Sequence, residues 1–380
     1  MSQFLHIVPD EKFIDIAISF FAGLGGNHRY LCICNKGESP FIYIKSKEVE
    51  RLLENEVRTI ITKGNYEAIV FHTLYPRCYP LVLCVPDKKT VFWFSWGADI
   101  YYGINGFHPV LNLNLYRPIT RRFLDRDISM IKRVKRKIKR ILPARKGQYA
   151  RNLLQARAIS KVDLCSTIIP TEYESLLKLP FFSAKFFPFK YVSDKNKEVS
   201  RFSSEGLFVL VNNSADLSGN HLDVLNLMNK RKITNPRIIP VSYGRNKAEL
   251  LSILPNYIRK NIDTLITDFM SIDDYKNRVH FCRAAVFGHI RQQALGNIVL
   301  CLRAGMKVFL YKKSLVYRYF KRIGIVLFSI EDDLSQNSIN QPLTEMMIQK
   351  NLGILSELYD YKTIMSYVAQ SLEENGLRVE

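Results

Sequence analysis

Polar residues follow an apolar run and precede a helical pattern at two places in the second half of the chain. The two stretches read "VNNSADLSGNH" from Val211 and "FGHIRQQALGN" from Phe287. Backbone N–H groups and short hydroxyls at the amino end of a helix form a natural site for an anion. The guanidinium of Arg291 can pair with phosphate oxygens. The pattern therefore predicts two phosphate-binding loops in one domain. The alternative for each is an ordinary polar surface loop.

The candidate residues for this ligand come from the two loops and from "PVSYG", which follows a third apolar run. They are Asn213, Ser214, Asp216, Ser242, Tyr243, Arg291, Gln292, Gln293, Gly296 and Asn297. The glutamine amides can donate hydrogen bonds, and the glycine permits a close approach of the backbone.

A single acid ends an apolar strand pattern in the first half, in "VFWFSWGADIYYG". Asp99 lies at the carboxyl end of the expected strand, where a substrate hydroxyl could meet it. The alternative is an aspartate that caps the following turn. Both tryptophans of the chain lie in this stretch. We expect both to serve mostly in packing, with Trp96 rather than Trp93 at the border of a cleft.

A glycine-rich stretch, "AGLGGNHRY", follows an expected helix rather than a strand, so it is a weak nucleotide-binding fingerprint. One interpretation is a helix stop and a turn. The functional alternative is a loop at which Asn27 and His28 contact substrate. The chain has no P-loop pattern and no G-x-G-x-x-G after a strand.

Positive charge is concentrated in one segment. The net charge of the chain is +20, and residues 117–160 contribute +13 of it, through fifteen basic residues and two acids. Ile131, Val134, Ile138 and Ile141 recur at helical spacing, so we expect a basic amphipathic helix. Its candidate membrane-facing residues are Lys132, Arg133, Lys135, Arg136, Lys139 and Arg140. An anionic membrane surface is the favoured partner. Nucleic acid, or a solvated helix packed on its own domain, are the alternatives.

Composition indicates a globular protein. A hydrophobic content of 47% over 380 residues is sufficient for two cores. No apolar run reaches the ~18 residues of a membrane span, and "MSQFLHIVPDEKF" has no signal-peptide pattern. The seven cysteines form no C-x-x-C pair, so we expect mostly buried thiols in a reducing cytoplasm and no zinc site.

Short apolar strands alternate with helical stretches in both halves of the chain, which predicts an α/β class with two doubly wound parallel sheets. In the first half we expect a helix over residues 46–64 and strands over residues 4–9, 29–35, 41–45 and 66–73. Thr171 is expected to cap a short helix. Two prolines and a charged, Ser-rich run place a domain boundary within residues 178–206. Ligands of such sheets bind at the carboxyl ends of the strands.

Taken together, these stretches resemble the TDP-N-acetylfucosamine:lipid II N-acetylfucosaminyltransferases, glycosyltransferase family 56. The likeness covers residues 90–328 and is carried by "VFWFSWGADIY", "VNNSADLSGNH", "IPVSYG", "SIDDYKNRVHFCRAAVFG", "IRQQALGN" and "LCLRAGMKVFL". The chain departs from the family pattern at Asn212, Ala215 and Ala294, where the family has glycine. It departs also at His289, where an aromatic residue is usual.

The resemblance implies a GT-B fold, with two Rossmann-like domains that face a cleft. Residues 1–188 would bind the acceptor, residues 189–357 the nucleotide-sugar, and a helix within residues 358–380 would return to the first domain. The implied reaction moves 4-acetamido-4,6-dideoxygalactose (Fuc4NAc) from dTDP to a polyprenyl-pyrophosphate-linked glycan. It takes place at the inner face of the bacterial cell membrane, as in synthesis of enterobacterial common antigen or O-antigen. Neither a metal, nor another cofactor, nor nucleic acid is expected.

We assign roles to individual residues from the motifs described above. Arg291 would neutralise the diphosphate leaving group, helped by Asn213, Ser214 and Gln292. Asp99 is the candidate base for the acceptor hydroxyl, or orients the acceptor if the reaction retains configuration. The acceptor-side residues are Asn27, His28 and Trp96. The alternatives are an enzyme of the same fold with another nucleotide-sugar, an inactive sugar-binding scaffold, and a basic nucleic-acid-binding protein.

Overall fold

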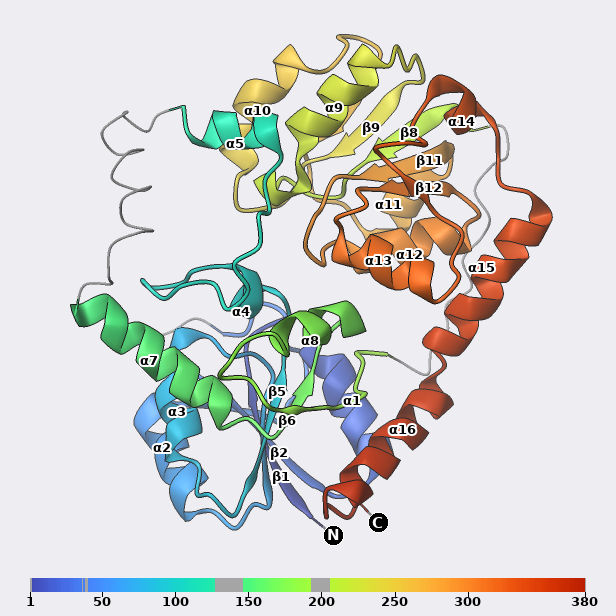
Figure 1. Cartoon of the computed structure of the whole chain (residues 1–380). Helices are drawn as coiled ribbons and strands as arrows, with labels where there is room; N and C mark the ends of the chain where they lie inside the picture. The colour runs from blue at the N-terminus through green and yellow to red at the C-terminus, as the bar shows by residue number, and fades with distance from the viewer. Residues whose placement is uncertain (1, 36, 38–39, 127–145, 193–205, 380) are drawn as a thin grey trace. The chain divides into compact units, whose positions relative to one another are not determined.

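The computed structural model describes residues 2–35, 37, 40–126, 146–192 and 206–379. The chain divides into two compact units, each with one parallel β-sheet (Figure 1). Unit 1 comprises Met1–Asn112, Pro143–Asn196 and Tyr359–Glu380, and unit 2 comprises Leu113–Leu142 and Lys197–Leu358. The predicted α/β class with two parallel sheets is therefore confirmed.

Unit 1 has seven strands in the order β3-β2-β1-β4-β5-β6-β7. They are β1 (Gln3–Val8), β2 (Asn27–Ile33), β3 (Val49–Leu52), β4 (Ala68–Phe71), β5 (Thr90–Phe94), β6 (Leu164–Ser166) and β7 (Lys185–Phe186). The helices are α1 (Ile14–Leu24), η1 (Pro76–Cys78), α2 (Glu54–Lys63), α3 (Tyr79–Cys84), α4 (Ala98–Tyr101), α7 (Lys146–Ser160), α8 (Pro170–Leu176) and α16 (Tyr361–Glu374). The strands β4 and β5 are apolar or nearly so along their whole length, as is usual where helices cover both faces of a parallel sheet.

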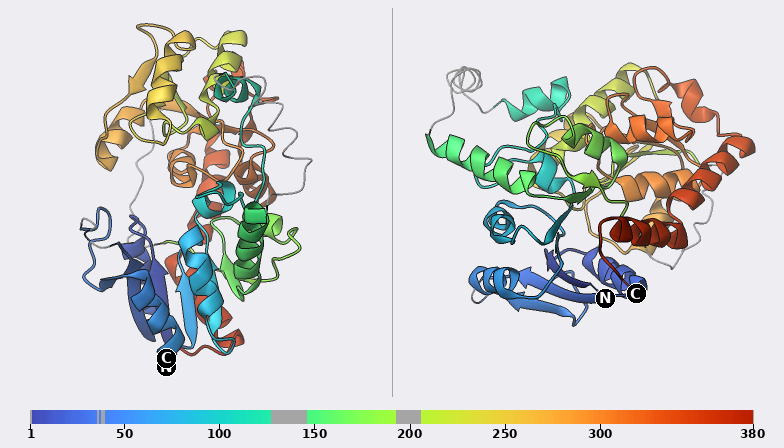
Figure 2. Two further views of the ribbon diagram at one scale, coloured as in Figure 1. Left: turned by 90° about the vertical axis from the view of Figure 1, so that its left-hand side faces the viewer. Right: turned by 60° about the horizontal axis from the view of Figure 1, so that its bottom comes forward.

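The last helix of the chain belongs to unit 1. Phe20 and Phe21 of α1, Phe94 of β5, and Val368 and Leu372 of α16 form part of one buried cluster. The backbone N–H of residue 2 donates to the carbonyl of residue 378 at 2.7 Å, so the two ends of the chain lie side by side (Figure 2).

Unit 2 has six strands in the order β10-β9-β8-β11-β12-β13. They are β8 (Phe208–Val211), β9 (Arg237–Pro240), β10 (Thr264–Ile266), β11 (Cys282–Phe287), β12 (Lys307–Leu310) and β13 (Phe328–Ser329). The helices are α5 (Pro118–Leu124), η2 (Leu217–Gly219), α9 (His221–Lys230), α10 (Lys247–Ile253), η3 (Leu254–Asn256), α11 (Ile272–Val279), α12 (Leu295–Arg303), α13 (Leu315–Arg322), α14 (Gln336–Asn340) and α15 (Glu345–Leu358). Ser271 caps α11 by accepting from the Asp274 N–H at 3.1 Å, as the sequence predicts.

Helix α5 is part of unit 2, whereas the sequence led us to place it with the first domain. Asp223 of α9 holds it in place. The carboxylate accepts from the backbone N–H groups of Ile119 at 2.9 Å and Thr120 at 2.8 Å, and from the Thr120 hydroxyl at 2.7 Å. This contact joins residues 103 positions apart in the sequence.

Residues 41–45, predicted as a strand, do not form one. The carboxylates of two aspartates accept hydrogen bonds from the backbone N–H groups of this segment. Asp10 accepts from residues 42, 43 and 44 at 2.7–3.1 Å, and Asp15 accepts from residues 45 and 46 at 3.0–3.1 Å. Apolar and other residues do alternate in this segment, as they do in a strand. Its backbone N–H groups, however, bind aspartate side chains and not the carbonyl groups of a neighbouring strand.

The helix predicted over residues 46–64 is wrong in its first half. Val49–Leu52 is the edge strand β3, which pairs in parallel with β2. Helix α2 begins at Glu54, where the side chain of Glu56 accepts from the Leu53 N–H at 2.7 Å. Its predicted end at Gly64 is confirmed.

Helix α8 begins before Thr171, which the sequence predicted as its cap. Pro170 is the first helical residue, and the N–H of Ile169 donates to the Glu172 carboxylate at 3.3 Å. Proline suits this first position because the N–H that it lacks would have no partner within the helix.

The predicted basic amphipathic helix lies outside the described residues. Its membrane-facing candidates Lys132, Arg133, Lys135, Arg136, Lys139 and Arg140 fall in this stretch, and their role stays a prediction. In the part of the chain that is described, no helix is both long and apolar enough to cross a bilayer. All seven cysteines are free thiols, and five of them are buried, in agreement with the prediction.

Candidate functional site

The two predicted phosphate loops meet at the carboxyl ends of adjacent strands in unit 2. The first loop follows β8, the second follows β11, and these strands pair in parallel. The buried side chain of Asn212 joins the loops. Its Oδ1 accepts from the Gly288 N–H at 2.9 Å, and its Nδ2 donates to the Gly219 carbonyl at 3.0 Å. We call residues 212–220, 242–246 and 288–294 the loop cluster.

Asp216 brings two arginines to the loop cluster. Its carboxylate lies 3.8 Å from the Arg291 guanidinium and 3.4 Å from that of Arg245, and it accepts from the Ser218 N–H at 2.9 Å. Burial by itself would raise the pKa of Asp216. The Ser218 hydrogen bond and the two positive charges outweigh burial, and the pKa lies below its ordinary value. Asp216 is therefore ionised at neutral pH and orients both guanidinium groups.

Further hydrogen bonds connect the predicted residues. The Asn213 amide donates to the Tyr243 hydroxyl at 3.1 Å, which ties in the loop after β9. The Ser218 hydroxyl donates to Gln293 Oε1 at 2.7 Å, across the two phosphate loops. The loop cluster and the first turn of α12 thus hold all ten predicted residues: Asn213, Ser214, Asp216, Ser242, Tyr243, Arg291, Gln292, Gln293, Gly296 and Asn297.

Among the described residues, several buried polar atoms at the loop cluster have no hydrogen-bond partner. They include Oδ1 of Asn213 and both ring nitrogens of His221 and His289. Burial lowers the pKa of His221 to about 4. Burial, with the nearby charge of Arg291, also lowers the pKa of His289. Buried polar atoms without partners are rare in folded proteins. A ligand bound at the loop cluster would supply the hydrogen bonds that these atoms lack.

Sequence reasoning did not single out either histidine as a candidate ligand contact. His221 ends the first of the two stretches that indicated phosphate binding, and His289 lies within the second. Their position in these stretches was the available signal, because a neutral imidazole both donates and accepts hydrogen bonds. The lack of protein partners, which singles them out, becomes visible only in the fold.

The predicted acceptor-side residues of unit 1 lie at two opposite edges of its sheet. Asn27 and His28 begin β2 and are therefore at the amino edge. Trp96 and Asp99 follow β5, at the carboxyl edge where ligands of parallel sheets bind. The structure does not bring Asn27 beside Asp99, and the acceptor contacts of all four residues stay predictions.

Asp99 is buried and accepts three hydrogen bonds. The donors are the Leu74 N–H at 3.1 Å, the Trp93 indole at 2.8 Å and the Trp96 N–H at 3.1 Å. Burial raises the pKa of Asp99, although the hydrogen bonds act in the opposite direction. The contacts fix the turn after β5, as a capping aspartate would, and a raised pKa suits a group that exchanges protons near neutral pH. Trp93 is fully buried, as expected.

A chain of hydrogen bonds links the two edges of this sheet. From the amino edge its members are Gly25, His28, His6, His72, Tyr191 and Trp96, with successive distances of 2.8, 2.9, 3.0, 3.0 and 2.5 Å. Burial lowers the pKa of all three histidines, so each is neutral at neutral pH. The Gly25 carbonyl can only accept, so His28 carries its proton on Nε2, and each following link must then also donate toward Gly25. Each of the three histidines therefore carries its proton on Nε2. We call this series the histidine chain.

The histidine chain predicts acid-sensitive folding of unit 1. Burial lowers the pKa of His72 to about 3 and also lowers those of His6 and His28. Below about pH 6.5 the unfolded chain binds protons that the folded chain does not. The contribution of the histidine chain to the free energy of unfolding should therefore be constant above this pH. Below it, each fully buried histidine should remove about 1.4 kcal/mol per pH unit.

Chemical denaturation at several pH values between 7.5 and 5 measures this slope. The His72→Phe variant should lose part of the slope, whatever its stability at neutral pH. The matched control is His108→Gln, because the His108 side chain is exposed. An identical slope in parent and His72→Phe protein would contradict a neutral histidine chain.

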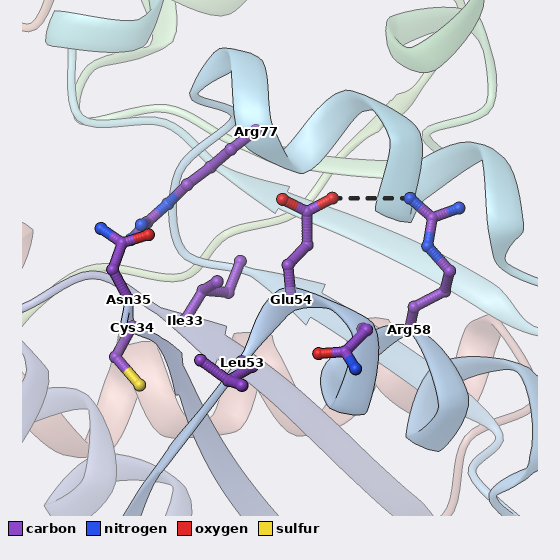
Figure 3. Close-up of a pocket in the computed structure, with 8 residues that line it drawn as sticks. Ile33, Cys34, Asn35, Leu53, Glu54, Arg58 and Arg77 are labelled. Carbon is purple, nitrogen blue, oxygen red and sulfur yellow. Dashed lines mark hydrogen bonds and ion pairs between the residues drawn. The ribbon is translucent and has the colours of Figure 1, made fainter. Parts of the chain in front are cut away.

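Unit 1 also has a polar pocket of about 490 Å³ at the carboxyl ends of β2 and β3 (Figure 3). Its lining residues are Ile33, Cys34, Asn35, Leu53, Glu54, Asn55, Arg58 and Arg77. Arg77 reaches toward Asn35, while Glu54 pairs with Arg58 at 3.5 Å (Figure 3). None of these residues is among the site residues predicted from the sequence, because the residues of β3 were expected to belong to a helix and the end of this strand was therefore not recognised.

Comparison with known proteins agrees with this geometry. A family model described as 4-alpha-L-fucosyltransferase, glycosyl transferase group 56, matches residues 175–358. HepE from Anabaena, solved in complex with UDP and glucose, has a TM-score of 0.62 at 11% identity, over 98% of this chain and 100% of that chain.

Two further solved structures are similar over nearly the whole chain. A glycosyltransferase from Rickettsia africae has a TM-score of 0.56 at 10% identity, over 98% of both chains. Sucrose-phosphate synthase from Thermosynechococcus elongatus has a TM-score of 0.56 at 7% identity, over 99% of both chains. At these identities the likeness shows the fold, which is GT-B. The resemblance predicted over residues 90–328 is thus confirmed where this range overlaps the family match, and the chain is a glycosyltransferase that matches group 56 over residues 175–358 and has a GT-B fold.

Proposed function

We propose that the protein transfers a 4-acetamido-4,6-dideoxyhexose from a dTDP-sugar to a polyprenyl-pyrophosphate-linked glycan. The reaction would serve surface polysaccharide synthesis at the inner face of the bacterial cell membrane. The group 56 match supports the sugar class, because a 4-acetamido-4,6-dideoxygalactose has the carbon skeleton of fucose and differs at position 4. The charge of +13 in residues 117–160 supports an acceptor held at an anionic membrane.

The donor site is assigned to the loop cluster of unit 2. The observation that carries this assignment is the set of unpartnered polar atoms of Asn213, His221 and His289, all within the matched segment. The imidazole N–H groups can donate to phosphate oxygens, and the Asn213 oxygen can accept from a base or a sugar hydroxyl. Arg291 neutralises the charge that develops on the departing diphosphate, and metal independence is part of this proposal.

The acceptor site is assigned to unit 1. Asp99, at the carboxyl edge of the sheet, is the proposed base for the acceptor hydroxyl. The pocket of Figure 3 lies at the same edge and offers two amides, a carboxylate and two guanidinium groups, which suit the hydroxyls of a glycan. Asn27 and His28, at the opposite edge, are not needed for this assignment.

Thermal denaturation with a panel of nucleotides tests the donor. We expect dTDP to raise the melting temperature more than UDP, GDP or CMP. A ligand at 100 times its Kd adds about 2.7 kcal/mol, which corresponds to a shift of roughly 5–10 °C for a unit of this size. Arg291→Ala should abolish the shift, because the guanidinium holds the diphosphate.

A second candidate is a UDP-sugar transferase of the same fold. The structure of HepE with UDP and glucose favours it, since HepE has the highest of the TM-scores given above. A larger shift with UDP than with dTDP would replace the first candidate by the second. No shift with any of the four nucleotides would refute the assignment of the loop cluster as a donor site.

A further inference from the structure

A second pocket, of about 480 Å³, lies in unit 2. One wall is α5 with the residues just before it, and the other is formed by one residue after β11 and one after β12. The lining residues are Asn114, Tyr116, Arg117, Pro118, Arg121, Arg122, Asp125, Ile290 and Lys313. Ile290 belongs to the loop cluster, so this pocket adjoins the proposed donor site without containing any of its predicted phosphate-binding side chains. We call it the α5 pocket.

Four cations and one carboxylate line the α5 pocket. Arg121, Arg122 and Lys313 are exposed, and with the described residues their side chains form no ion pair or hydrogen bond. Arg117 is oriented by Tyr311, with its guanidinium carbon 4.6 Å from the ring centroid. This excess of positive charge around a hollow favours an anionic ligand, and arginine forks suit phosphate oxygens in particular.

Buried polar side chains fix this cationic wall to the core of unit 2. Asn220, which is fully buried, accepts from the Arg117 N–H at 2.7 Å and donates to the Leu115 carbonyl at 3.0 Å. The same amide donates to the Gly288 carbonyl at 2.8 Å, in the second phosphate loop. One side chain therefore positions both the wall of the α5 pocket and the loop cluster. Together with Asp223, it makes α5 a preorganised support for its arginines rather than a loose surface segment.

The geometry points to a binding site for a pyrophosphate group in the α5 pocket, separate from the donor diphosphate. We assign the group to the lipid-linked acceptor, and this source rests on the proposed function, whereas the anion site itself does not. A pyrophosphate diester carries twice the charge of a phospholipid phosphodiester, so it matches four cations and one carboxylate better. In the sequence, the basic stretch "KRVKRKIKR" begins eight positions after α5 ends, and such a stretch favours an anionic membrane surface.

Binding to the full-length protein tests the site. Inorganic pyrophosphate and a short-chain polyprenyl pyrophosphate are titrated by calorimetry at low salt with saturating dTDP present, so that the donor site is occupied, and dTDP is titrated on its own. The triple variant Arg121→Gln, Arg122→Gln, Lys313→Gln should bind both pyrophosphates about 10-fold more weakly or worse, and dTDP unchanged. The matched control removes the same charge from exposed positions of unit 2 and should change each affinity less than two-fold. It carries Lys230→Gln, Lys260→Gln and Lys350→Gln.

Each other outcome overturns a defined part of the inference. Equal weakening by the two triple variants would mean non-specific attraction, and weaker dTDP binding by the α5-pocket variant would make the pocket part of the donor site. The α5-pocket variant could instead lose binding to phosphatidylglycerol vesicles while it binds both pyrophosphates as the parent does. That result would identify a phospholipid headgroup as the ligand and overturn the acceptor assignment. A parent protein that binds pyrophosphate here but not dTDP would contradict the proposed function and leave the anion site standing.

Discussion

Replacement of Arg291 by alanine is expected to lower turnover by roughly 100-fold to 1000-fold. Its guanidinium donates to the Gln292 carbonyl at 2.9 Å and lies 3.8 Å from Asp216, so it is oriented before any ligand binds. A preoriented charge in a buried site acts most strongly where negative charge develops, which here is the departing diphosphate. Steady-state kcat and KM for the donor, with donor hydrolysis as a second readout, measure the effect.

Arg245 provides a matched comparison for Arg291. Both guanidinium groups face Asp216, but the side chain of Arg245 is 55% exposed against 10% for Arg291. Exposed charges are screened by water and salt, so Arg245→Ala should lose less than about 10-fold. Arg291→Lys should fall between the two alanine variants, because it keeps the charge but loses the planar fork. Unchanged donor affinity and turnover in Arg291→Ala would refute the proposed neutralisation.

The loop cluster could be predicted because its signals are local. Each loop is a short polar run between a strand and a helix, and parallel strands bring their carboxyl ends to one edge of a sheet. The sequence therefore located Asn213, Asp216 and Arg291 without any knowledge of the packing. The proposed roles of His221 and His289 could not be predicted, because an imidazole without a hydrogen-bond partner is recognised by its surroundings in the fold and not by its neighbours in the chain.

The edge of unit 1 shows why other local signals mislead. The apolar alternation in residues 41–45 is that of a strand, yet the carboxylates of Asp10 and Asp15 bind this backbone from 30 or more positions away. The histidine chain likewise joins His6, His72 and Tyr191, whose contacts span 66 and 119 positions. No spacing rule relates such residues, since strand order rather than sequence distance brings them together.

The position of α5 depends on a similar long-range contact. Its seven residues contain the arginines that made the segment read as part of a basic first domain. Its backbone N–H groups, however, are bound by Asp223, and a helix as short as this takes its position from tertiary contacts rather than from its own propensity. Judged by charge alone, α5 belongs with the basic stretch that follows it in the sequence. Its hydrogen bonds to Asp223, however, make it part of unit 2, to which the donor site is assigned.

Replacement of Asp99 by asparagine is expected to have two separable effects. The carboxylate of Asp99 accepts hydrogen bonds from the N–H groups of Leu74, Trp93 and Trp96. In an asparagine, the NH₂ group would face at least one of these N–H groups, which would then have no acceptor. Leaving such a buried donor without an acceptor costs about 1–3 kcal/mol of unfolding free energy. Loss of the base should in addition lower kcat by about 100-fold or more, measured with saturating donor at a temperature where the variant is fully folded.

The pH dependence of kcat separates the two roles of Asp99. Burial raises the pKa of Asp99 above that of an ordinary aspartate. If the reaction needs the ionised carboxylate, kcat should fall as the pH drops through this raised pKa. This acid limb should be absent from the residual activity of Asp99→Asn. Trp93→Phe removes an N–H that lowers the pKa of Asp99, so the limb should move to higher pH. A destabilised Asp99→Asn protein with near-normal kcat would make Asp99 the structural cap of its turn and require the base to be sought among other residues of unit 1.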